Sequence, residues 1–388
     1  ATTTVTNAST GQPELRPIHY FCIDQDFEYY NFYLDFGPFN LGHLYQFCRM
    51  LNEKLDDSRF SNHVICYYSS AAPTNRTNAA YLICAWQVLY MNKTPEESFA
   101  GFTGDKGGKV VSSPPRSVMN GGDDVLSPIP FHDATQFVCT YDLTVLDCIR
   151  GLAKARAYGF FDFSSFDLKE YRFYEQVENG DLNWILYGKI VAFAGPERVR
   201  RVSPSGHYAL TPSDLIPYFK KRNIGLVVRL NEKRYDEQDF VTAGIDFCDS
   251  VYPDGSCPPM STLRKVVAAF ESVPSDKGFA VHCKAGLGRT GTMIGAYLMK
   301  HYRLTAAEAI GWMRICRPGM VIGPQQQFLE DIEQRMWHEG SVMTEKPARS
   351  LFGSMADRLL GSRQSSESSS GSKRRSDRYD KTAEGVVI

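Results

Sequence analysis

The stretch "VHCKAGLGRTG", residues 281–291, determines the fold that we predict for the second half of the chain. An apolar run leads into Cys283, and Arg289 follows six positions later. We expect a β-strand that ends at His282, a loop over residues 283–288 and a helix that starts near Arg289. In such a turn the backbone N–H groups of the loop and the positive end of the helix dipole face the same point.

A dianionic phosphate fits at that point, and a thiol placed there is stabilised as the thiolate, so Cys283 is the predicted nucleophile. Two glycines let the backbone turn inward without a Cβ. The planar fork of Arg289 can hold two phosphate oxygens and bind them more tightly as charge develops in the transition state. The residues expected to bind the phosphate are Lys284, Ala285, Gly286, Leu287, Gly288 and Arg289.

The alternative is that Cys283 is an inert, buried residue of a glycine-rich turn. The five-residue spacer, the paired glycines and the Arg-Thr pair together disfavour that alternative. We interpret His282 as a hydrogen-bonded core residue that orients the loop, rather than as a catalytic base. Thr290 either donates a hydrogen bond to the thiolate or caps the helix.

If the phosphate is an ester of serine or threonine, an acid is needed, because the serine or threonine oxygen leaves readily only when it is protonated. A further group is needed to orient the water that hydrolyses the phosphocysteine. Asp254, in "YPDGSCPP", lies on a loop rich in Gly and Pro that can swing over the site. The alternative is an ordinary turn residue before Gly255. Gln325, in "GPQQQFL", can orient the attacking water, although three glutamines also suit a solvated helix start.

The first half of the chain repeats this design. There, "HVICYYS" leads into Ser70, and Arg76 follows six positions later, before a long apolar run. Both halves continue into a helix-start pattern, "TPEE" at residues 94–97 and "TAAE" at residues 305–308, in which a threonine caps the helix and a glutamate reaches back. We infer an internal duplication, against a chance similarity of two strand–loop–helix units.

The composition predicts a soluble intracellular protein. The formal net charge of -1 gives no reason to expect nucleic-acid or membrane-surface binding. The ten cysteines include no CxxC pair, a pattern typical of reduced thiols, and the longest apolar run, residues 79–91, is too short to span a bilayer.

Strands are predicted at residues 189–195 and 224–230, with a helix between them at "LTPSDLIPYFKKR" and further helices at residues 143–158, 261–273 and 325–337. This alternation indicates an α/β fold with helices on the faces of a sheet. The predicted organisation is a disordered tail (1–14), a first domain (15–165) with a loop insertion (104–130), a linker helix (166–185), a second domain (186–338) and a disordered tail rich in Ser and basic residues (339–388).

The "HCxxGxxR[ST]" signature resembles that of the protein tyrosine phosphatase superfamily. The set "HCKAGLGRTGTMIGAYLMKHY", "ICRPGMVIGPQQQFL", "YPDGSCP", "DFGPFNL" and "FYEQVENGDLNWI" is similar to the cell-division-cycle-fourteen family of dual-specificity phosphatases. The resemblance implies two tandem phosphatase-like folds, of which the first lacks the nucleophile. It implies catalysis by Cys283, Arg289 and Asp254 with a glutamine of the 325–327 run, and no metal or organic cofactor.

The resemblance also implies phosphoprotein substrates, chiefly phosphoserine followed by proline and then a basic residue, the sites that cyclin-dependent kinases create. The implied role is in mitotic exit and cytokinesis, with nuclear and cytoplasmic localisation that extends to nucleolus, centrosome or spindle. An acidic groove would bind the basic residue. The carboxylates that match it are Asp35, Asp133, Glu175 and Asp181. Arg172 stands where the family usually has another glutamate, which weakens the expected preference.

Two rival functions are weighed against this prediction. A phosphoinositide phosphatase of the tensin-like type would carry a second lysine in the middle of the loop, where this chain has Leu287. A non-catalytic phosphoprotein-binding scaffold would not need Cys283, Arg289 and Asp254 to be present together. Neither membrane insertion nor nucleic-acid binding is expected, and the sequence does not predict the oligomeric state.

Overall fold

The computed structural model describes residues 2–6, 12–102, 127–202, 208–344 and 386–387 of the 388-residue chain. These residues form two compact units. The first contains the described residues up to Leu168 together with Arg314–Pro318 and the last strand, and the second contains the described residues of Lys169–Met313 and of Gly319–Arg374. Each unit has a sheet with helices around it, which confirms the predicted α/β fold class. Of the helices in these ranges, none is long and apolar enough to cross a membrane.

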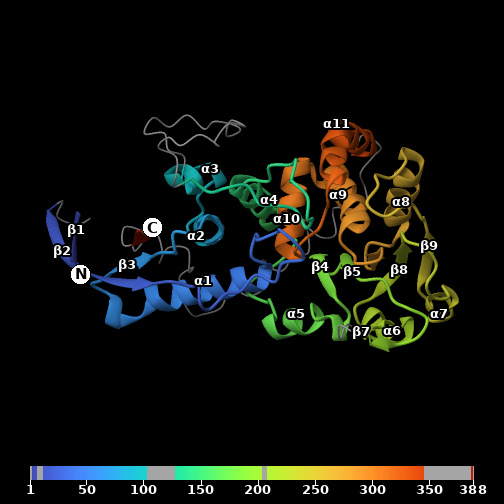
Figure 1. The fold of residues 1–388 in the computed structure, drawn as a ribbon, viewed down its shortest axis with the longest axis horizontal. Helices are drawn as coiled ribbons and strands as arrows, with labels where there is room; N and C mark the ends of the chain where they lie inside the picture. The colour runs from blue at the N-terminus through green and yellow to red at the C-terminus, as the bar shows by residue number, and fades with distance from the viewer. Residues whose placement is uncertain (1, 7–11, 103–126, 203–207, 345–385, 388) are drawn as a thin grey trace, which may run out of the picture. The chain divides into compact units, whose positions relative to one another are not determined.

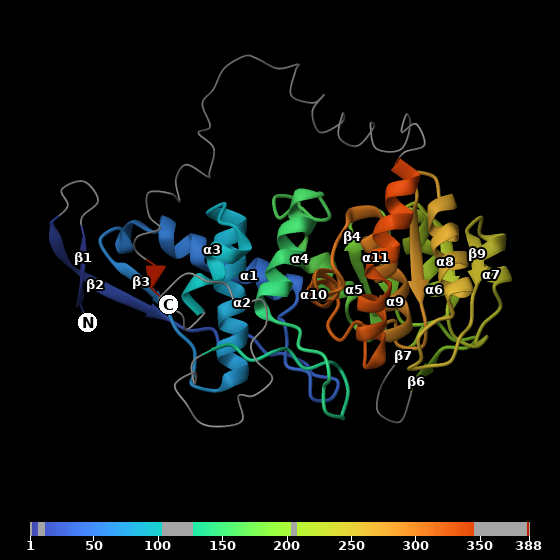
Figure 2. The same cartoon turned by 90° about the horizontal axis from the view of Figure 1, so that it is seen from above.

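The first unit has a four-stranded sheet in the order β1-β2-β3-β11. Its strands are β1 (Thr2–Thr6), β2 (Pro13–Phe21), β3 (Val64–Tyr67) and β11 (Val386–Val387), and its helices are α1 (Leu41–Asp56), α2 (Pro73–Tyr90), α3 (Pro95–Phe99) and α4 (Val145–Ala157). β1 and β2 pair in antiparallel fashion as a hairpin (Figure 2), and β3 is parallel to β2. The strand–loop–helix unit expected around Ser70 is therefore β3, its following loop and α2.

The second unit has a five-stranded sheet in the order β4-β5-β10-β8-β9. Its strands are β4 (Leu182–Leu186), β5 (Ile190–Phe193), β8 (Ile224–Arg229), β9 (Asp246–Asp249) and β10 (Gly278–His282), with the short pair β6 (Arg201–Val202) and β7 (Tyr208–Ala209) beside them. The helices are α5 (Leu168–Tyr174), α6 (Pro212–Lys221), α7 (Gln238–Thr242), α8 (Met260–Ser272), α9 (Gly288–Tyr302), α10 (Ala306–Cys316) and α11 (Pro324–Thr344). In Figure 1, α8, α9 and α11 cover one face of this sheet and α6 covers the other.

The central strands β8 and β10 are parallel to each other, and every residue of both is buried. A parallel strand covered on both faces carries a continuous apolar run, and "IGLVV" and "GFAV" are such runs. The predicted strands at residues 189–195 and 224–230 correspond to β5 and β8, and the helices predicted nearby correspond to α4, α6, α8 and α11. β10 therefore places its last residue, His282, at the middle of the sheet edge.

The predicted linker helix over residues 166–185 is wrong for most of its length. The helix covers only Leu168–Tyr174, a 3-10 turn follows at Val177–Asn179, and the remainder enters the sheet as β4. The helix ends at Tyr174, before the extended backbone of Gln176 (φ -69°, ψ 141°), and the positive φ angles of Gly180 and Asp181, 133° and 45°, then turn the chain into β4. The apolar run "LNWIL" then pairs with β5 in antiparallel fashion.

The disordered tails are also predicted too long. Thr2–Thr6 is β1, because its β-branched residues suit an extended strand that pairs with β2. At the other end, α11 continues to Thr344, and Val386 and Val387 pair with β3 in parallel. The loop insertion lies mostly outside the described residues, as does the rest of the C-terminal tail.

The two helix-start patterns fold as the sequence predicts. Thr94 and Glu97 form a reciprocal capping box at α3, with Pro95 in the first turn. At α10 the Thr305 N–H donates to Glu308 Oε2 at 2.7 Å, and the Glu308 N–H donates to Thr305 Oγ1 at 3.1 Å. Both threonines therefore satisfy N–H groups that the helix itself leaves without partners.

The α10 capping box gives a stability prediction. Replacing Thr305 by Ala should lower the free energy of unfolding by about 1 kcal/mol, because the Glu308 N–H then loses its side-chain acceptor. Thr305→Ser keeps the hydroxyl and should retain most of the stability. Urea unfolding followed by circular dichroism measures both variants, and equal loss in both would contradict the capping role.

Candidate active site

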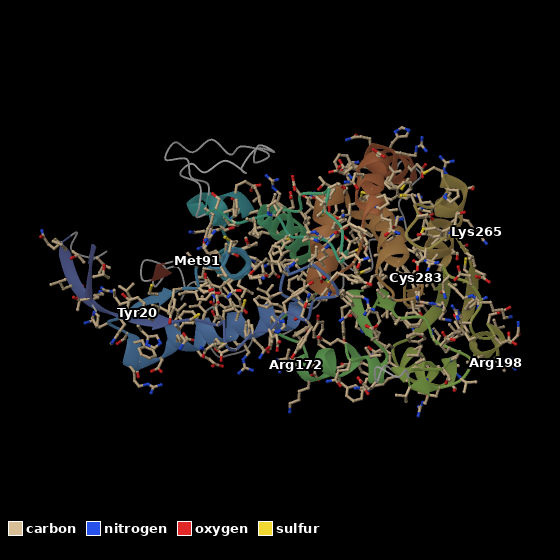
Figure 3. The ribbon with its side chains drawn as sticks, viewed as in Figure 1. Tyr20, Met91, Arg172, Arg198, Lys265 and Cys283 are labelled. Carbon is tan, nitrogen blue, oxygen red and sulfur yellow. The ribbon has the colours of Figure 1, made fainter. Side chains whose placement is uncertain are left out.

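The loop after β10 has the predicted geometry. β10 ends at His282 and α9 begins at Gly288, so Cys283 stands at the C-terminal end of the central strand. Its side chain is 3% exposed, and Figure 3 shows it between the sheet and α9. Helix α9 spans 15 residues, so its N-terminal N–H groups and its dipole act at the loop.

Two glycines allow the loop to approach β5 closely. Gly286 has a φ of +67°, and a Cβ there would lie 2.1 Å from the Phe193 carbonyl oxygen. A Cβ on Gly195 would lie 2.3 Å from the Cys283 carbonyl oxygen, and the Gly195 N–H donates to the Lys284 carbonyl at 3.0 Å. We did not predict Gly195; its signal in the sequence is a glycine directly after a buried strand, "KIVAFAG".

Arg289 is held rigidly with its guanidinium group in the site. Its side chain is 1% exposed, and Nη1 donates to the Tyr252 carbonyl at 3.0 Å. Nη2 lies 3.1 Å from Asp254 Oδ1, which brings the predicted acid to the predicted phosphate-binding arginine. Its Nε makes no hydrogen bond within the part of the chain that the structure describes. A buried guanidinium N–H without a protein acceptor is suited to a phosphate oxygen.

The structure shows neither of the two roles predicted for Thr290 as a formed hydrogen bond. Its hydroxyl oxygen is buried and has no hydrogen-bond partner among the described residues. A threonine that capped α9 would accept a backbone N–H bond, and α9 has no side-chain cap bond. Donation from this hydroxyl to the Cys283 sulfur stays a prediction.

Asp254 and Gln325 meet the loop from two other elements. Asp254 precedes Gly255, which has a φ of +68°, and its side chain is 65% exposed. Gln325 is buried at the start of α11, and its Nε2 donates to the Ser256 carbonyl at 3.0 Å. A Cβ on Gly288 would lie 2.7 Å from Gln325 Oε1. Gln325 thus connects the acid loop to the start of α9.

The other residues of the loop differ in exposure. Lys284 and Ala285 are exposed, whereas the Leu287 side chain is 4% exposed. Leu287 therefore presents no polar group at the position where a lipid phosphatase loop would have its second lysine.

The first two groove carboxylates are buried within their own loops. Asp35 is 3% exposed and accepts hydrogen bonds from the N–H groups of Phe32 and Tyr33 and from the Tyr29 hydroxyl. Asp133 is 2% exposed and accepts from the Thr135 hydroxyl at 2.8 Å. Both carboxylates order the turns that contain them, so neither is a solvated surface charge.

The other two groove residues belong to the second unit. The Asp181 carbonyl accepts from the Ala194 N–H at 3.1 Å, and Ala194 precedes the glycine that contacts the Cys283 loop. Glu175 is half-buried after α5, and Arg172 is exposed on the same helix (Figure 3). Asp181 therefore lies near the catalytic loop, while the assignment of the groove as a whole stays a prediction.

The matching loop in the first unit keeps the turn with different contacts. The Ser70 N–H donates to Asp24 Oδ2 at 2.7 Å, and the Ser70 hydroxyl accepts from Asn75 at 2.9 Å. Arg76 donates to the Ala71 carbonyl, and Pro73 removes an N–H from the start of α2. A protein carboxylate and internal hydrogen bonds thus occupy groups that could otherwise face an anion.

A cluster with metal-ligating atoms lies in the first unit. Ligand atoms of His132, Asp133 and Cys139 are within 4.8 Å of one another. Their present contacts are with the protein: His132 Nδ1 lies 2.7 Å from the Asp133 carbonyl oxygen, and the Cys139 thiol donates to the Tyr141 carbonyl. None of these three residues belongs to the set of residues predicted to act with Cys283 in catalysis.

The class of protein follows from this geometry. The protein tyrosine phosphatase superfamily has a cysteine at the end of a central parallel strand, followed by a glycine-rich loop and by an arginine in the first turn of the next helix. It also has an aspartate on a facing loop, and this chain has all four features. A family model described as "Dual specificity protein phosphatase, N-terminal half" matches residues 3–108. One described as "Polymorphic toxin system, DSP-PTPase phosphatase" matches residues 207–303.

Curated proteins refine this assignment. The chain is 47% identical to dual specificity protein phosphatase CDC14AB of Danio rerio over 84% of its length and 50% of that protein. It is 45% identical to human CDC14A over 84% of its length and 52% of that protein, and 41% identical to human CDC14C over 85% and 69%. The chain belongs to the CDC14 family of dual specificity phosphatases. It spans about half the length of the first of these relatives.

His282 makes the stability of the second unit pH-dependent. Burial lowers the pKa of His282 to about 4 from the ordinary value of 6.5. The unfolded chain therefore binds more protons than the folded one between these values, and stability is present above pH 6.5 and is lost as the pH falls through 4.

We expect His282 to contribute a loss of about 3 kcal/mol over that range. His282→Asn removes the titrating group, so its urea midpoint should fall less between neutral and acidic pH than that of the unsubstituted protein. An identical pH dependence in both proteins would contradict the assignment.

Proposed function

We propose that this chain is a cysteine-dependent dual-specificity protein phosphatase that hydrolyses phosphoserine, phosphothreonine and phosphotyrosine through a phosphocysteine intermediate. One observation carries the proposal: Arg289 Nη2 lies 3.1 Å from Asp254 Oδ1 at the start of the helix that follows Cys283. The nucleophile Cys283 and the phosphate-binding Arg289 lie at the two ends of one loop. The acid Asp254, which is distant in the sequence, comes from the neighbouring loop. Fold alone would not support an activity, because one fold serves many functions.

In the first step the Cys283 thiolate attacks phosphorus. The sulfur–phosphorus bond forms as the bond from phosphorus to the substrate oxygen breaks. Arg289 and the N–H groups of residues 284–289 stabilise the charge on the equatorial oxygens. The bound phosphate accepts the hydrogen bonds of the Arg289 guanidinium group, so protonated Asp254 is released from Arg289. Asp254 then donates its proton to the departing oxygen.

In the second step water cleaves the phosphocysteine. Gln325 orients the water from the start of α11, and the Asp254 carboxylate accepts the water proton as the oxygen attacks phosphorus. Inorganic phosphate leaves, and the Cys283 thiolate is regenerated. The Thr290 hydroxyl donates to the sulfur as its charge returns, since that hydroxyl has no acceptor among the described residues.

The preferred substrates in this proposal are phosphoserine-proline sites with a basic residue shortly after the proline, and the role is in mitotic exit and cytokinesis. Membership of the CDC14 family supports both. Asp181 beside the catalytic loop supports a preference for a basic residue, and the exposed Arg172 opposes it. A phosphoinositide substrate is disfavoured because Leu287 is apolar and buried.

Replacing the nucleophile tests the activity. Cys283→Ser should lower phosphate release from a phosphoserine-proline peptide by at least about 1,000-fold and leave peptide binding intact, because the loop keeps its N–H groups and Arg289. Release of inorganic phosphate and fluorescence anisotropy of a labelled peptide measure the two effects. Cys248→Ser, on β9 of the same unit, is the matched control.

Unchanged turnover in Cys283→Ser would refute the nucleophile assignment. Turnover of a soluble phosphoinositide by the unsubstituted protein, with no turnover of the peptide, would refute the substrate class.

Charge reversal on α5 tests the preference for a basic residue. Arg172→Glu places a carboxylate one helical turn before Glu175, and it should raise the ratio of kcat/KM for a lysine-containing peptide over its alanine counterpart by about threefold. Lys220→Glu, exposed on α6, makes the same charge change and should leave the ratio unaltered. Equal ratios in the two variants would show that Arg172 does not face the peptide.

A further inference from the structure

Arg229 is a buried arginine with no role in the chemistry described so far. It is the last residue of β8, and its side chain is 1% exposed. Its guanidinium carbon lies 5.0 Å from the centroids of two aromatic rings, those of Tyr235 and Phe247. An arginine enclosed by two rings gains cation–π attraction, which increases when water is excluded.

The positive charge of Arg229 is paired with two carboxylates. Nη2 lies 2.6 Å from Asp249 Oδ2 and Nε donates to Oδ1 at 3.2 Å, while Glu237 Oε2 lies 3.3 Å from Nη2. Nη1 donates to the Tyr235 carbonyl at 3.1 Å. The paired carboxylate and the fixed hydrogen bonds hold the guanidinium in one place, as a buried charge requires.

Tyr235 connects this cation to His282. The Tyr235 hydroxyl oxygen lies 2.6 Å from His282 Nε2, and both residues are buried. His282 Nδ1 lies 2.9 Å from the Cys283 carbonyl oxygen. A carbonyl can only accept, so Nδ1 carries the proton, Nε2 is the acceptor and the Tyr235 hydroxyl donates to it.

The strand register brings these residues together. Arg229 and His282 are paired neighbours on the parallel strands β8 and β10, and the Leu230 N–H donates to the His282 carbonyl at 3.0 Å. The residue after Arg229 and the residue before Cys283 are thus joined by the backbone, in addition to the side-chain path through Tyr235.

We propose that Arg229 is a positioning residue for Cys283, acting through Tyr235 and His282. The cation against the phenol ring makes its O–H a stronger donor, and a stronger bond to Nε2 makes the Nδ1 proton a stronger donor to the Cys283 carbonyl. That bond holds the first peptide of the loop in the orientation in which the loop N–H groups point at the sulfur. The inference rests on the proposed function of Cys283 as the nucleophile.

Other charged groups face the same residues and must be kept constant. The charges of Arg229, Asp249 and Arg289 act on His282, and its low pKa, about 4, keeps it uncharged at neutral pH. On the other side of the loop, burial and the charge of Cys283 raise the pKa of the Tyr252 phenol well above its usual range. Asp254 is paired with Arg289.

The test measures thiolate formation without turnover. The rate at which iodoacetamide alkylates Cys283 in the full chain is followed from about pH 5 to 9 by mass spectrometry of the Cys283 peptide, because only the thiolate reacts. Arg229→Met should move the midpoint of this profile about half a unit to higher pH, which lowers the rate on the acidic side about threefold. Arg229→Lys keeps the cation and should give an intermediate shift.

A second variant separates positioning from folding. Tyr235→Phe removes one hydroxyl and no charge, and it should shift the midpoint in the same direction. The double variant should shift it little further, because both changes interrupt one path. If Arg229→Met does not fold, as judged by circular dichroism, Tyr235→Phe decides the question alone.

The chain offers matched controls at the opposite end of the same strand. Arg222, just before β8, also stacks on two aromatic rings and pairs with Glu170, and Tyr218 in the same core also has a hydrogen-bonded hydroxyl. Arg222→Met and Tyr218→Phe should leave the midpoint unchanged. Equal midpoints in the Tyr235 and Tyr218 variants would overturn the inference while leaving the phosphatase proposal intact. An unsubstituted protein whose Cys283 is no more reactive than its buried thiols would instead overturn the phosphatase proposal itself.

Discussion

The second unit depends on how closely the loop after β10 approaches the end of β5. Side chains at Gly286 and Gly195 would lie 2.1 Å and 2.3 Å from backbone oxygens, distances that no Cβ can occupy. The approach lets the Gly195 N–H bind the loop at Lys284 and sets the loop N–H groups inward. The reactivity expected of Cys283 follows from this packing, since the field at the sulfur comes from backbone dipoles that the close approach fixes.

The same edge of the sheet gathers the remaining chemistry. Parallel strands end at one edge, so the segments after β5, β8, β9 and β10 all emerge beside Cys283. The acid loop follows β9, and Arg289 binds the carbonyl oxygens of Leu230 and Tyr252, which follow β8 and β9. Arg289 therefore has two functions, because it holds adjoining loops in place and keeps an Nε that has no acceptor within the described part of the chain.

The features that the sequence could predict are those whose residues lie close together along the chain. Cys283, Arg289 and the helix start lie within one strand–loop–helix segment, so their spacing alone indicates their geometry. Gly195, Tyr235 and Arg229 reach the site only through strand pairing, and spacing along the chain contains no signal for that. The linker helix was predicted too long because its helical pattern does not reveal the extended backbone at Gln176. The turn that the Asp35 carboxylate closes also has no signal in the sequence, and the place of Asp35 in a groove stays a prediction.

The first unit shows that the strand–loop–helix segment can form without the catalytic residues. Its β3–loop–α2 segment keeps the turn, yet the Ser70 N–H binds the Asp24 carboxylate and Pro73 supplies no N–H at the helix start. The turn is therefore stable without a thiolate or a bound phosphate, because a protein carboxylate can satisfy the N–H groups. It follows that the strand–loop–helix junction is maintained by packing and hydrogen bonding of its own. The chemistry at Cys283 is added to that junction by a thiol, two glycines and an arginine whose remaining N–H is left without a protein acceptor among the described residues.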